Sequence, residues 1–457
     1  MSLKVVILAA GKGTRMRSSQ PKVLQSLAKR PLLSHVVSTA EKLGAQEIVT
    51  VIGHGSDAVR QTIQSDRLVF VMQHEQLGTG HAVQHADSHI MDDDVVLVLY
   101  GDVPLTRVET LQGLLNQVDE SHPLALLTTH LEDSTGYGRI VRNAQHRVEA
   151  IVEEKDATYK QKQIKEINTG ILAARGQWLK IWLNRLSNNN AQGEYYLTDI
   201  IAMCVEDGFV VKTAQPTELM EVLGVNNKQQ LQALERLYQA SLANQLMEQG
   251  VTLLDASRID VRGHLEVGQD VEIDVNAVFE GDVSLGNRVK VGANCVIKNC
   301  TIAADTTIEA FSHLEDASIG QDCVIGPYAR IRPGSQLANQ VKIGNFVETK
   351  KALIGEGSKV NHLSYIGDTE MGQGCNIGAG TITCNYDGVN KHKTIIGDQV
   401  FIGSDTQLVA PVEVEKGATI GAGSTITKTA PANELTLSRS KQVTIKGWQK
   451  PTKKALK

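Results

Sequence analysis

Aliphatic residues recur every six positions through the second half of the chain. The first stretch of this pattern contains Val267, Ile273, Phe279, Leu285, Val291 and Ile297. The pattern resumes at Ile302 and continues through Ile308, Leu314, Ile319, Ile325, Ile331, Leu337 and Ile343. A repeat of this length predicts a parallel β-helix built from short rungs. Because one coil cannot bury its apolar side alone, the aliphatic residues are expected to point inward from stacked coils.

Some steps of the repeat contain five residues instead of six, and they divide the pattern into coils. The shorter steps are Ile297 to Ile302, Leu314 to Ile319, Thr349 to Ile354 and Ile366 to Met371. Coils then begin every 17 or 18 residues, at Leu285, Ile302, Ile319, Leu337, Ile354 and Met371. This spacing predicts three faces per coil, a triangular prism whose coils stack at about 4.8 Å.

The first half of the chain alternates strand-like and helix-like patterns. The strand-like runs are Lys4–Ala9, Glu47–Ile52, Leu68–Met72, Val95–Tyr100 and Leu124–Thr129, and helical runs include Leu32–Leu43 and Thr106–Val118. Such alternation predicts a mostly parallel, doubly wound sheet. After this domain, leucines at helical spacing predict a linker helix. We expect an N-terminal domain over 1–227, the linker helix over 228–250, and the prism with a Lys-rich tail over 251–457.

Length and composition narrow the possible functions. A chain of 457 residues predicts more than one domain, and a net charge of −5 argues against nucleic acid as the main partner. No run resembles a signal peptide or a membrane span. The six cysteines (204, 295, 300, 323, 375 and 384) form no C-x-x-C motif, which favours reduced thiols in a cytoplasmic protein.

A glycine-rich segment follows the first strand and reads Leu-Ala-Ala-Gly-Lys-Gly-Thr-Arg-Met from Leu8, with Pro21-Lys22 shortly after it. Glycines at this position let backbone N–H groups approach an anion, and Arg15 and Lys22 add positive charge. Neither the P-loop nor the dinucleotide-binding glycine pattern is present. The two glycines alone would also be compatible with a simple tight turn.

Asp102 follows another predicted buried strand, at the edge where open α/β sheets bind ligands. An aspartate there often caps a helix. Beside an anion-binding loop it is instead a candidate Mg²⁺ ligand, because hard cations prefer carboxylate oxygen.

The three-faced frame aligns polar and small residues on successive coils of the prism. His362, Ala379, Ser404 and Ala422 each lie two positions past an inward aliphatic residue and form one column. Three inter-coil steps span roughly 14 Å, enough for a thin extended ligand such as a pantetheine arm. Small residues are also what prism corners require, but that explanation does not account for the histidine.

A second column contains Arg332 and Lys350, whose like charges lie about one strand spacing apart. A substrate phosphate would relieve their repulsion, although two splayed, solvated side chains would do so too. Glu348 and Tyr365 align in a neighbouring column. The polar insertion Cys384–Ile395 interrupts the later coils, and such projecting loops often contain functional residues.

Together these motifs resemble two known families. The segment from Leu8 to Met16 with Pro21-Lys22 resembles sugar-nucleotide pyrophosphorylases, and the repeat resembles the left-handed β-helix of hexapeptide acyltransferases. Across the whole chain the sequence resembles the family of bifunctional N-acetylglucosamine-1-phosphate uridyltransferase/glucosamine-1-phosphate acetyltransferases. The resemblance implies an α/β, Rossmann-like nucleotidyltransferase domain followed by an all-β left-handed parallel β-helix.

The resemblance also implies site residues. In the N-terminal domain, UTP and the sugar nucleotide would contact Leu8, Ala9, Ala10, Gly11, Lys22, Gln73, Gly78, Thr79, Tyr100, Gly101, Asp102, Gly138, Glu153, Asn168 and Asn226. Asp102 and Asn226 would bind Mg²⁺, and Arg15 and Lys22 would assist the transfer.

In the prism, the resemblance makes His362 the general base, with Glu348 orienting it and Ser404 stabilising the oxyanion. The sugar phosphate would contact Arg332, Lys350, Tyr365 and Asn376, and acetyl-CoA would contact Ala379, Asn385, Tyr386, Ser404, Ala422 and Arg439. The family is a homotrimer acting on small molecules, with acetyl transfer preceding uridylyl transfer.

Two other functions fit part of the sequence. A pyrophosphorylase with a purely structural or regulatory β-helix would not need His362 or the inserted loop. A nucleotide-sensing or scaffold subunit would not need intact Arg15, Lys22 and Asp102.

Overall fold

The structure is a computed structural model that describes residues 2–453. The chain divides into two compact units after Gln239, within the long helix α7 (Lys228–Glu248).

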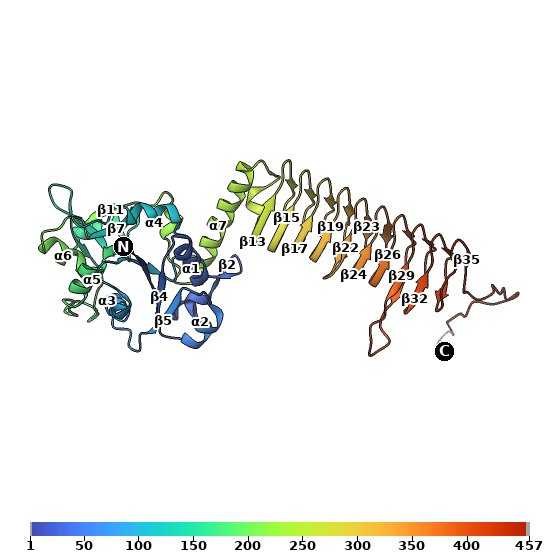
Figure 1. The fold of residues 1–457 in the computed structure, drawn as a ribbon, viewed down its shortest axis with the longest axis horizontal. Coiled ribbons are helices and arrows are strands. Elements are labelled where there is room, and N and C mark those ends of the chain that lie inside the picture. Colours follow the sequence, from blue (N-terminus) through green and yellow to red (C-terminus); the bar gives the residue numbers. More distant parts are fainter. Residues whose placement is uncertain (1, 454–457) are drawn as a thin grey trace. The chain divides into compact units, whose positions relative to one another are not determined.

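The first unit contains a mixed sheet (Figure 1). Along the sheet the order is β11 (Lys212–Ala214), β7 (Leu124–His130), β10 (Glu166–Arg175), β6 (Val95–Tyr100), β1 (Leu3–Ala9), β4 (Glu47–Ile52) and β5 (Leu68–Met72). The predicted strands are confirmed to within one residue at each end. The antiparallel strand β10 between β6 and β7 was not anticipated, because its sequence shows nothing that distinguishes its direction.

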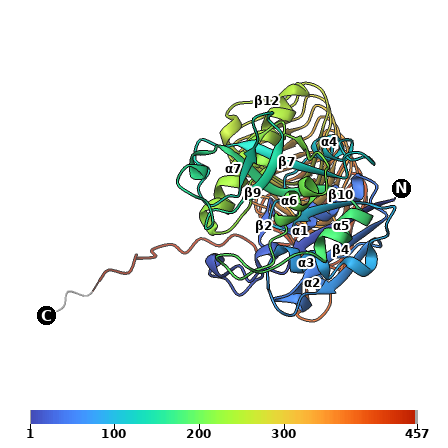
Figure 2. The same cartoon turned by 90° about the vertical axis from the view of Figure 1, so that its left-hand side faces the viewer.

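Helices cover both faces of this sheet (Figure 2). Alternate residues of β1 point into opposite cores. Val5 and Ile7 belong to one core, and Val6 and Leu8 belong to the other. One core includes side chains of α1 (Leu32–Lys42), α2 (Ser56–Thr62) and α4 (Val108–Leu115). The other includes α3 (Thr79–Gln84), α5 (Gly176–Leu183) and α6 (Asp199–Glu206). The remaining elements of this unit are β2 (Ser26–Leu27), β3 (Arg30–Pro31), β8 (Arg139–Arg142), β9 (Val148–Val152) and short 3₁₀ turns at Thr14–Met16, Lys22–Leu24, Asp87–His89, Gln161–Gln163 and Leu219–Val222.

Helix α4 begins two residues later than predicted. The Thr106 hydroxyl donates to the Glu221 carbonyl at 2.8 Å, and the Arg107 amide donates to the Glu221 carboxylate at 3.2 Å. These bonds from outside the helix hold the backbone before Val108.

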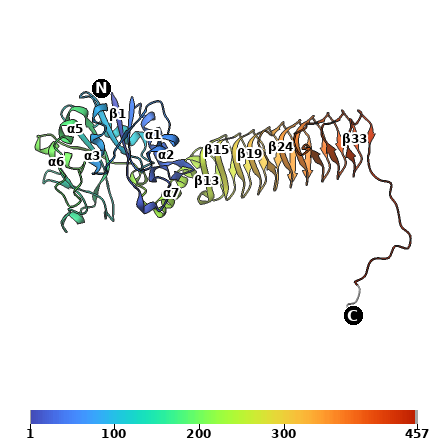
Figure 3. The same cartoon turned by 90° about the horizontal axis from the view of Figure 1, so that it is seen from below.

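The second unit is a prism of stacked parallel strands (Figure 3). One sheet contains β12 (Thr252–Leu253), β14 (Glu272–Ile273), β16 (Lys290–Val291), β18 (Thr307–Ile308), β20 (Val324–Ile325), β23 (Lys342–Asn345), β25 (Lys359–His362), β27 (Asn376–Ile377), β30 (Phe401–Ile402), β33 (Thr419–Ile420) and β35 (Leu435–Thr436). The strands of the other faces are β13 (Ile259–Val267), β15 (Ala277–Leu285), β17 (Val296–Ile302), β19 (His313–Ile319), β21 (Arg330–Ile331), β22 (Gln336–Leu337), β24 (Glu348–Ile354), β26 (Tyr365–Met371), β28 (Ile382–Cys384), β29 (Thr394–Ile396), β31 (Gln407–Val409), β32 (Val412–Val414) and β34 (Thr425–Ile426). A 3₁₀ turn occupies Ala256–Arg258.

Strand register confirms the predicted coil starts. Successive pairs join Leu285 to Ile302, Ile302 to Ile319, Ile319 to Leu337, Leu337 to Ile354 and Ile354 to Met371. The aliphatic residues form one continuous buried core, as predicted. The architecture is consistent with a left-handed β-helix.

The five-residue steps share one backbone feature. Each contains one residue in the left-handed region within an otherwise continuous strand: Asn299, Asp316, Lys351 and Asp368, with φ between 46 and 48°. In the six-residue steps the left-handed residue, such as Arg288 or Asn294, lies instead in the turn between two separate strands.

The insertion between β28 and β29 projects from the prism as a small hairpin (Figure 1). Tyr386 and Lys391 form an antiparallel bridge, and the Asp387 carboxylate accepts from the His392 ring at 2.7 Å. The prism continues undisturbed beyond it, because Met371 pairs with Ile396.

All six cysteines are free in the structure. Burial raises the pKa of Cys295 and of Cys300 to about 11, so both remain protonated at neutral pH. Within residues 2–453, no helix has the length and apolar character needed to cross a membrane.

Candidate active sites

The first site lies where β1 and β6 end. The chain moves from β1 to β4 and β5 on one side of the sheet, and then crosses to β6 on the other side of β1. Such a reversal separates the following loops and opens a crevice. A cavity of about 330 Å³ occupies this position. Its lining includes the predicted residues Leu8, Ala9, Ala10, Gly11, Lys22, Gln73, Gly78, Thr79, Tyr100 and Asp102, together with Val23, Gln76, Ala82 and Glu194, which the sequence had not indicated.

The glycine loop at this cavity has a defined backbone requirement. Gly13 adopts φ of 59°, and a Cβ there would lie 2.7 Å from the Lys22 Cβ. A side chain at this position would therefore displace Lys22. No heavy atom lies within 4 Å of the position that a Gly11 Cβ would take, so a ligand can approach the backbone there.

Asp102 and Asn226 converge although they are far apart in the sequence. The Lys22 ammonium donates to the Asp102 carboxylate and, at 3.4 Å, to Asn226 Oδ1. Arg15 donates to the same Asn226 oxygen at 2.9 Å, and the Val225 amide donates to the Asp102 carbonyl at 3.0 Å. Two oxygens therefore face one cationic position.

Neither oxygen belongs to a helix cap. Helix α4 follows Arg107, not Asp102. At the start of α7, the Asn227 side chain accepts from the Gln230 amide at 2.8 Å, whereas the Asn226 side chain turns toward Arg15 and Lys22. The structure therefore excludes the capping interpretation for Asp102, and Asn226 does not cap α7 either.

A second cavity of about 280 Å³ adjoins the first and shares Tyr100 and Asp102 with it. Arg15, Asn226, Tyr137 and Thr169 also line it.

The remaining predicted residues of this unit lie near these cavities but do not line them. The Gly101 amide donates to the Leu8 carbonyl at 3.0 Å. The Asn168 amide donates to the Gly138 carbonyl at 2.8 Å, and Thr198 donates to the Glu153 carboxylate at 3.0 Å. Burial raises the pKa of Glu153. Burial also raises the pKa of the Tyr100 hydroxyl, and the nearby charges of Glu153 and Asp102 raise it further.

The prism places the predicted histidine column in register. Val360 pairs with Ile377, Ile377 with Ile402, and Ile402 with Ile420. The residues two positions later, His362, Ala379, Ser404 and Ala422, therefore align on successive coils at the prism surface.

One further residue belongs to this column. Asn345 pairs with His362 in the strand register, and its Oδ1 lies 3.0 Å from His362 Nδ1. An amide oxygen only accepts, so Nδ1 donates the hydrogen, and in the neutral ring Nε2 carries the lone pair. The coil frame could have identified Asn345, because it lies two positions past Ile343.

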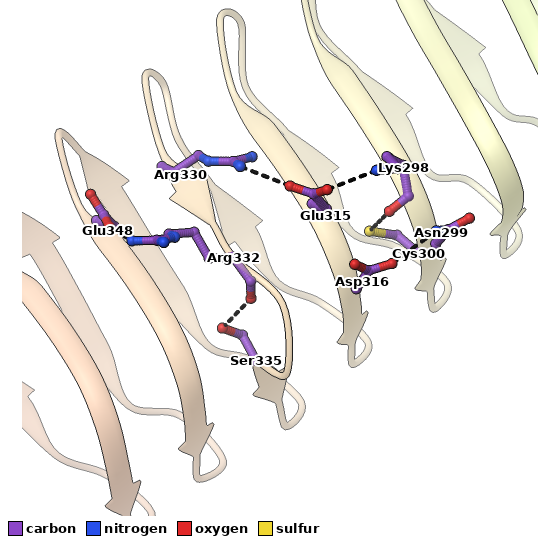
Figure 4. Close-up of polar contacts among 9 residues, drawn as sticks. All are labelled: Lys298, Asn299, Cys300, Glu315, Asp316, Arg330, Arg332, Ser335 and Glu348. Carbon is purple, nitrogen blue, oxygen red and sulfur yellow. Dashed lines mark hydrogen bonds and ion pairs between the residues drawn. The ribbon is translucent and has the colours of Figure 1, made fainter. Parts of the chain in front are cut away.

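Glu348 aligns with Tyr365 as expected, but its side chain contacts Arg332 and not His362. Its carboxylate accepts from Arg332 at 2.6 Å (Figure 4). Asn345 makes the contact to His362 instead. The reason is the register: Glu348 lies one face away from His362 and next to the arginine column.

Charges alternate along the neighbouring coils. Glu315 accepts from Lys298 and from Arg330, each at 2.9 Å (Figure 4). The backbone bond from Arg332 to Thr349 aligns Arg332 with Lys350, as predicted. Within residues 2–453, Lys350 has no hydrogen-bond or ion-pair partner. This cation can accept an external anion without breaking an internal contact.

The hairpin residues have distinct environments. Asn385 is buried, and its amide donates to Asp368 and, at 3.4 Å, to the Tyr365 hydroxyl. Tyr386 is exposed, with the Lys391 ammonium 4.1 Å from its ring centroid. Arg439 donates to the Ala422 carbonyl at 2.9 Å, and Asn376 is partly buried beside Lys359.

Comparisons with known proteins match both units. A family model of the MobA-like NTP transferase domain matches residues 5–251, one of the GMPPB C-terminal domain matches 261–347, and one of the bacterial transferase hexapeptide (six repeats) matches 393–428. The chain is 70% identical over 453 residues to the "Bifunctional protein GlmU" of Hydrogenovibrio crunogenus, covering 99% of this chain and all of the relative. It is 59% identical over 451 residues to the protein of that name from Marinobacter nauticus and 57% identical over 452 residues to that from Aromatoleum aromaticum, with 99% of each chain covered.

Proposed function

Because this chain belongs to the GlmU family of bifunctional enzymes, which combine uridyltransferase and acetyltransferase activities, we propose that each unit holds one active site. The cavity beside Asp102 transfers a uridylyl group from UTP to N-acetylglucosamine 1-phosphate. The His362 column transfers an acetyl group from acetyl-CoA to glucosamine 1-phosphate. The observation that supports this assignment best is the convergence of Asp102, Asn226 and Lys22 beside the glycine loop.

Asp102 and Asn226 fit a Mg²⁺ site. Each presents a side-chain oxygen to the position that the Lys22 ammonium occupies in this structure. Hard cations such as Mg²⁺ prefer oxygen ligands of this kind. Bound Mg²⁺ would neutralise charge on the triphosphate and on the departing pyrophosphate.

The chain's own residues position the reactants of uridylyl transfer. A phosphate oxygen of the sugar attacks the α-phosphorus, the bond to the β-phosphate breaks, and pyrophosphate leaves. Arg15 and Lys22 stabilise the developing charge, and the backbone around Gly11 approaches the phosphates. Gln73, Gly78 and Thr79 contact the base, while Gly138, Glu153 and Asn168 contact the sugar.

In acetyl transfer, His362 Nε2 takes the proton from the substrate amine, whose nitrogen attacks the thioester carbonyl. The C–S bond then breaks, and the departing sulfur of coenzyme A takes the proton that His362 carries. Ser404 donates to the oxyanion, and acetyl-CoA lies along Ala379, Asn385, Tyr386, Ser404, Ala422 and Arg439.

The sugar phosphate lies against Arg332, Lys350, Tyr365 and Asn376. Lys350 has no internal partner to give up, whereas Arg332 exchanges the Glu348 carboxylate for the phosphate. The released carboxylate is then available to the substrate amine. We place the acetyl-transfer sites between neighbouring prisms of a homotrimer, since His362 is exposed on the surface of a single prism.

An assay that omits one substrate at a time tests both activities. With glucosamine 1-phosphate, acetyl-CoA, UTP and Mg²⁺, the purified protein should form the UDP-sugar. Omitting acetyl-CoA should stop its formation, and N-acetylglucosamine 1-phosphate should restore it. UDP-sugar formation that does not require acetyl-CoA would contradict the proposed order of reactions.

Replacing Asn345 with Leu should lower acetyl transfer about tenfold, the value of one hydrogen bond. The His362 ring would no longer be held with its proton on Nδ1. Asn345→Asp keeps an acceptor at the same place and should retain most activity. Steady-state rates of thiol release measure both variants, and equal activity of Asn345→Leu and the native chain would rule out this role for Asn345.

A further inference from the structure

The Gln73 side chain is held by two contacts at the wall of the first cavity. The residue is buried, with 3% of its surface exposed. Its Nε2 lies 3.3 Å from the Gly78 carbonyl oxygen and 3.1 Å from His81 Nδ1. His81 does not line the cavity, yet it contacts a residue that does.

These contacts determine which way the amide points. A carbonyl oxygen only accepts, so the amide nitrogen of Gln73, and not its oxygen, must face Gly78. The second hydrogen of this nitrogen then points to His81 Nδ1, which must have a lone pair. His81 is therefore neutral, with its hydrogen on Nε2.

The arrangement leaves Gln73 Oε1 available. Within the described part of the chain, no group donates to this oxygen. Gln73 lines the cavity, and of its two amide atoms only the oxygen has no partner within the described residues, so the oxygen is the atom left to contact a ligand there.

The His81 ring is itself braced. On helix α3, the His85 ring packs edge-on against it with centroids 4.7 Å apart, and the Tyr195 ring lies 6.2 Å away. The Tyr195 carbonyl accepts from the Gly80 amide at 2.8 Å, which fixes that segment beside α3. The histidine therefore presents Nδ1 to Gln73 from a fixed position.

We propose that His81 is a positioning residue for base selection: together with the Gly78 carbonyl, it holds the Gln73 amide so that its oxygen accepts the imide N3–H of uracil. Cytosine has a lone pair at N3, which would oppose the Gln73 oxygen, so the same geometry rejects it. The inference rests on the proposed uridylyl transfer in this cavity. In this proposal His81, a residue outside the cavity, determines that Gln73 offers the base a hydrogen-bond acceptor and not a donor.

Three variants test this role through kcat/KM for UTP and for CTP, with N-acetylglucosamine 1-phosphate as acceptor. His81→Phe keeps an aromatic ring and removes the acceptor, so the UTP-to-CTP ratio should fall about tenfold, with the change for UTP mainly in KM. His81→Asn restores an acceptor near the Nδ1 position and should recover most of the ratio. His85→Phe, the matched control, should leave the ratio unchanged, because Phe keeps a ring packed against His81 and residue 85 has no hydrogen bond to Gln73.

The outcomes separate this inference from the function on which it rests. A native enzyme that does not prefer UTP over CTP would refute uridylyl transfer itself. A native preference that His81→Phe leaves intact would overturn the role of His81 alone. An equal loss in His81→Phe and His81→Asn would show that His81 only supports the fold around α3.

Discussion

Replacing His362 with Ala is expected to lower acetyl transfer about 10³-fold and to leave uridylyl transfer unchanged. The side chain is exposed at the prism surface, so its loss leaves no cavity in the core. What is lost is Nε2, the atom whose lone pair Asn345 leaves free. Release of thiol from acetyl-CoA measures the first activity, and release of pyrophosphate measures the second.

A matched control separates the base from a general effect on the prism. His264 is an exposed histidine of β13, in another column, and His264→Ala should leave both activities at the native level. If His362→Ala retained acetyl transfer, the base would be another group. If it abolished both activities in a folded protein, the two sites would not be independent.

The sequence predicted the prism well because one physical requirement dominates it. Every coil must place an aliphatic residue in the shared core, so inward positions such as Ile331 and Ile343 repeat at a fixed interval. The interval then gives the register, and the register aligns His362 with the small residues of later coils. Alignment along a column was therefore predictable from spacing alone.

Contacts across a face were not predictable in the same way. Whether Asn345 or Glu348 contacts His362 depends on side-chain directions at a corner, and spacing does not specify them. Asn385 shows the same limit. The inserted loop was correctly identified, but nothing in its sequence indicated that this amide is buried against Asp368.

In the first unit, local pattern located the strands, and the crevice at their carboxyl ends followed from general α/β geometry. The convergence of Asp102 with Asn226 required family resemblance, because the two residues lie on separate loops and each is compatible with a helix cap. Only the fold shows that both turn toward Lys22. The sequence did not point to His81, because this residue lies behind the cavity wall. Resemblance to motifs that contact ligands gives no signal for such a residue.

Replacing Asp102 with Ala is expected to lower uridylyl transfer about 10²- to 10³-fold while acetyl transfer stays at the native rate. The substitution removes one of the two oxygens at the proposed Mg²⁺ position and leaves the Lys22 ammonium with only the 3.4 Å contact to Asn226. Mg²⁺ titration of pyrophosphate release should show a higher requirement for the metal.

Asp66→Ala, which removes an exposed carboxylate elsewhere in the same unit, controls for the change in net charge and should behave as the native chain. An unchanged Mg²⁺ requirement and rate in Asp102→Ala would mean that this carboxylate does not hold the metal. Together with the reverse pattern for His362→Ala, the expected result means that the two reactions occur at separate sites.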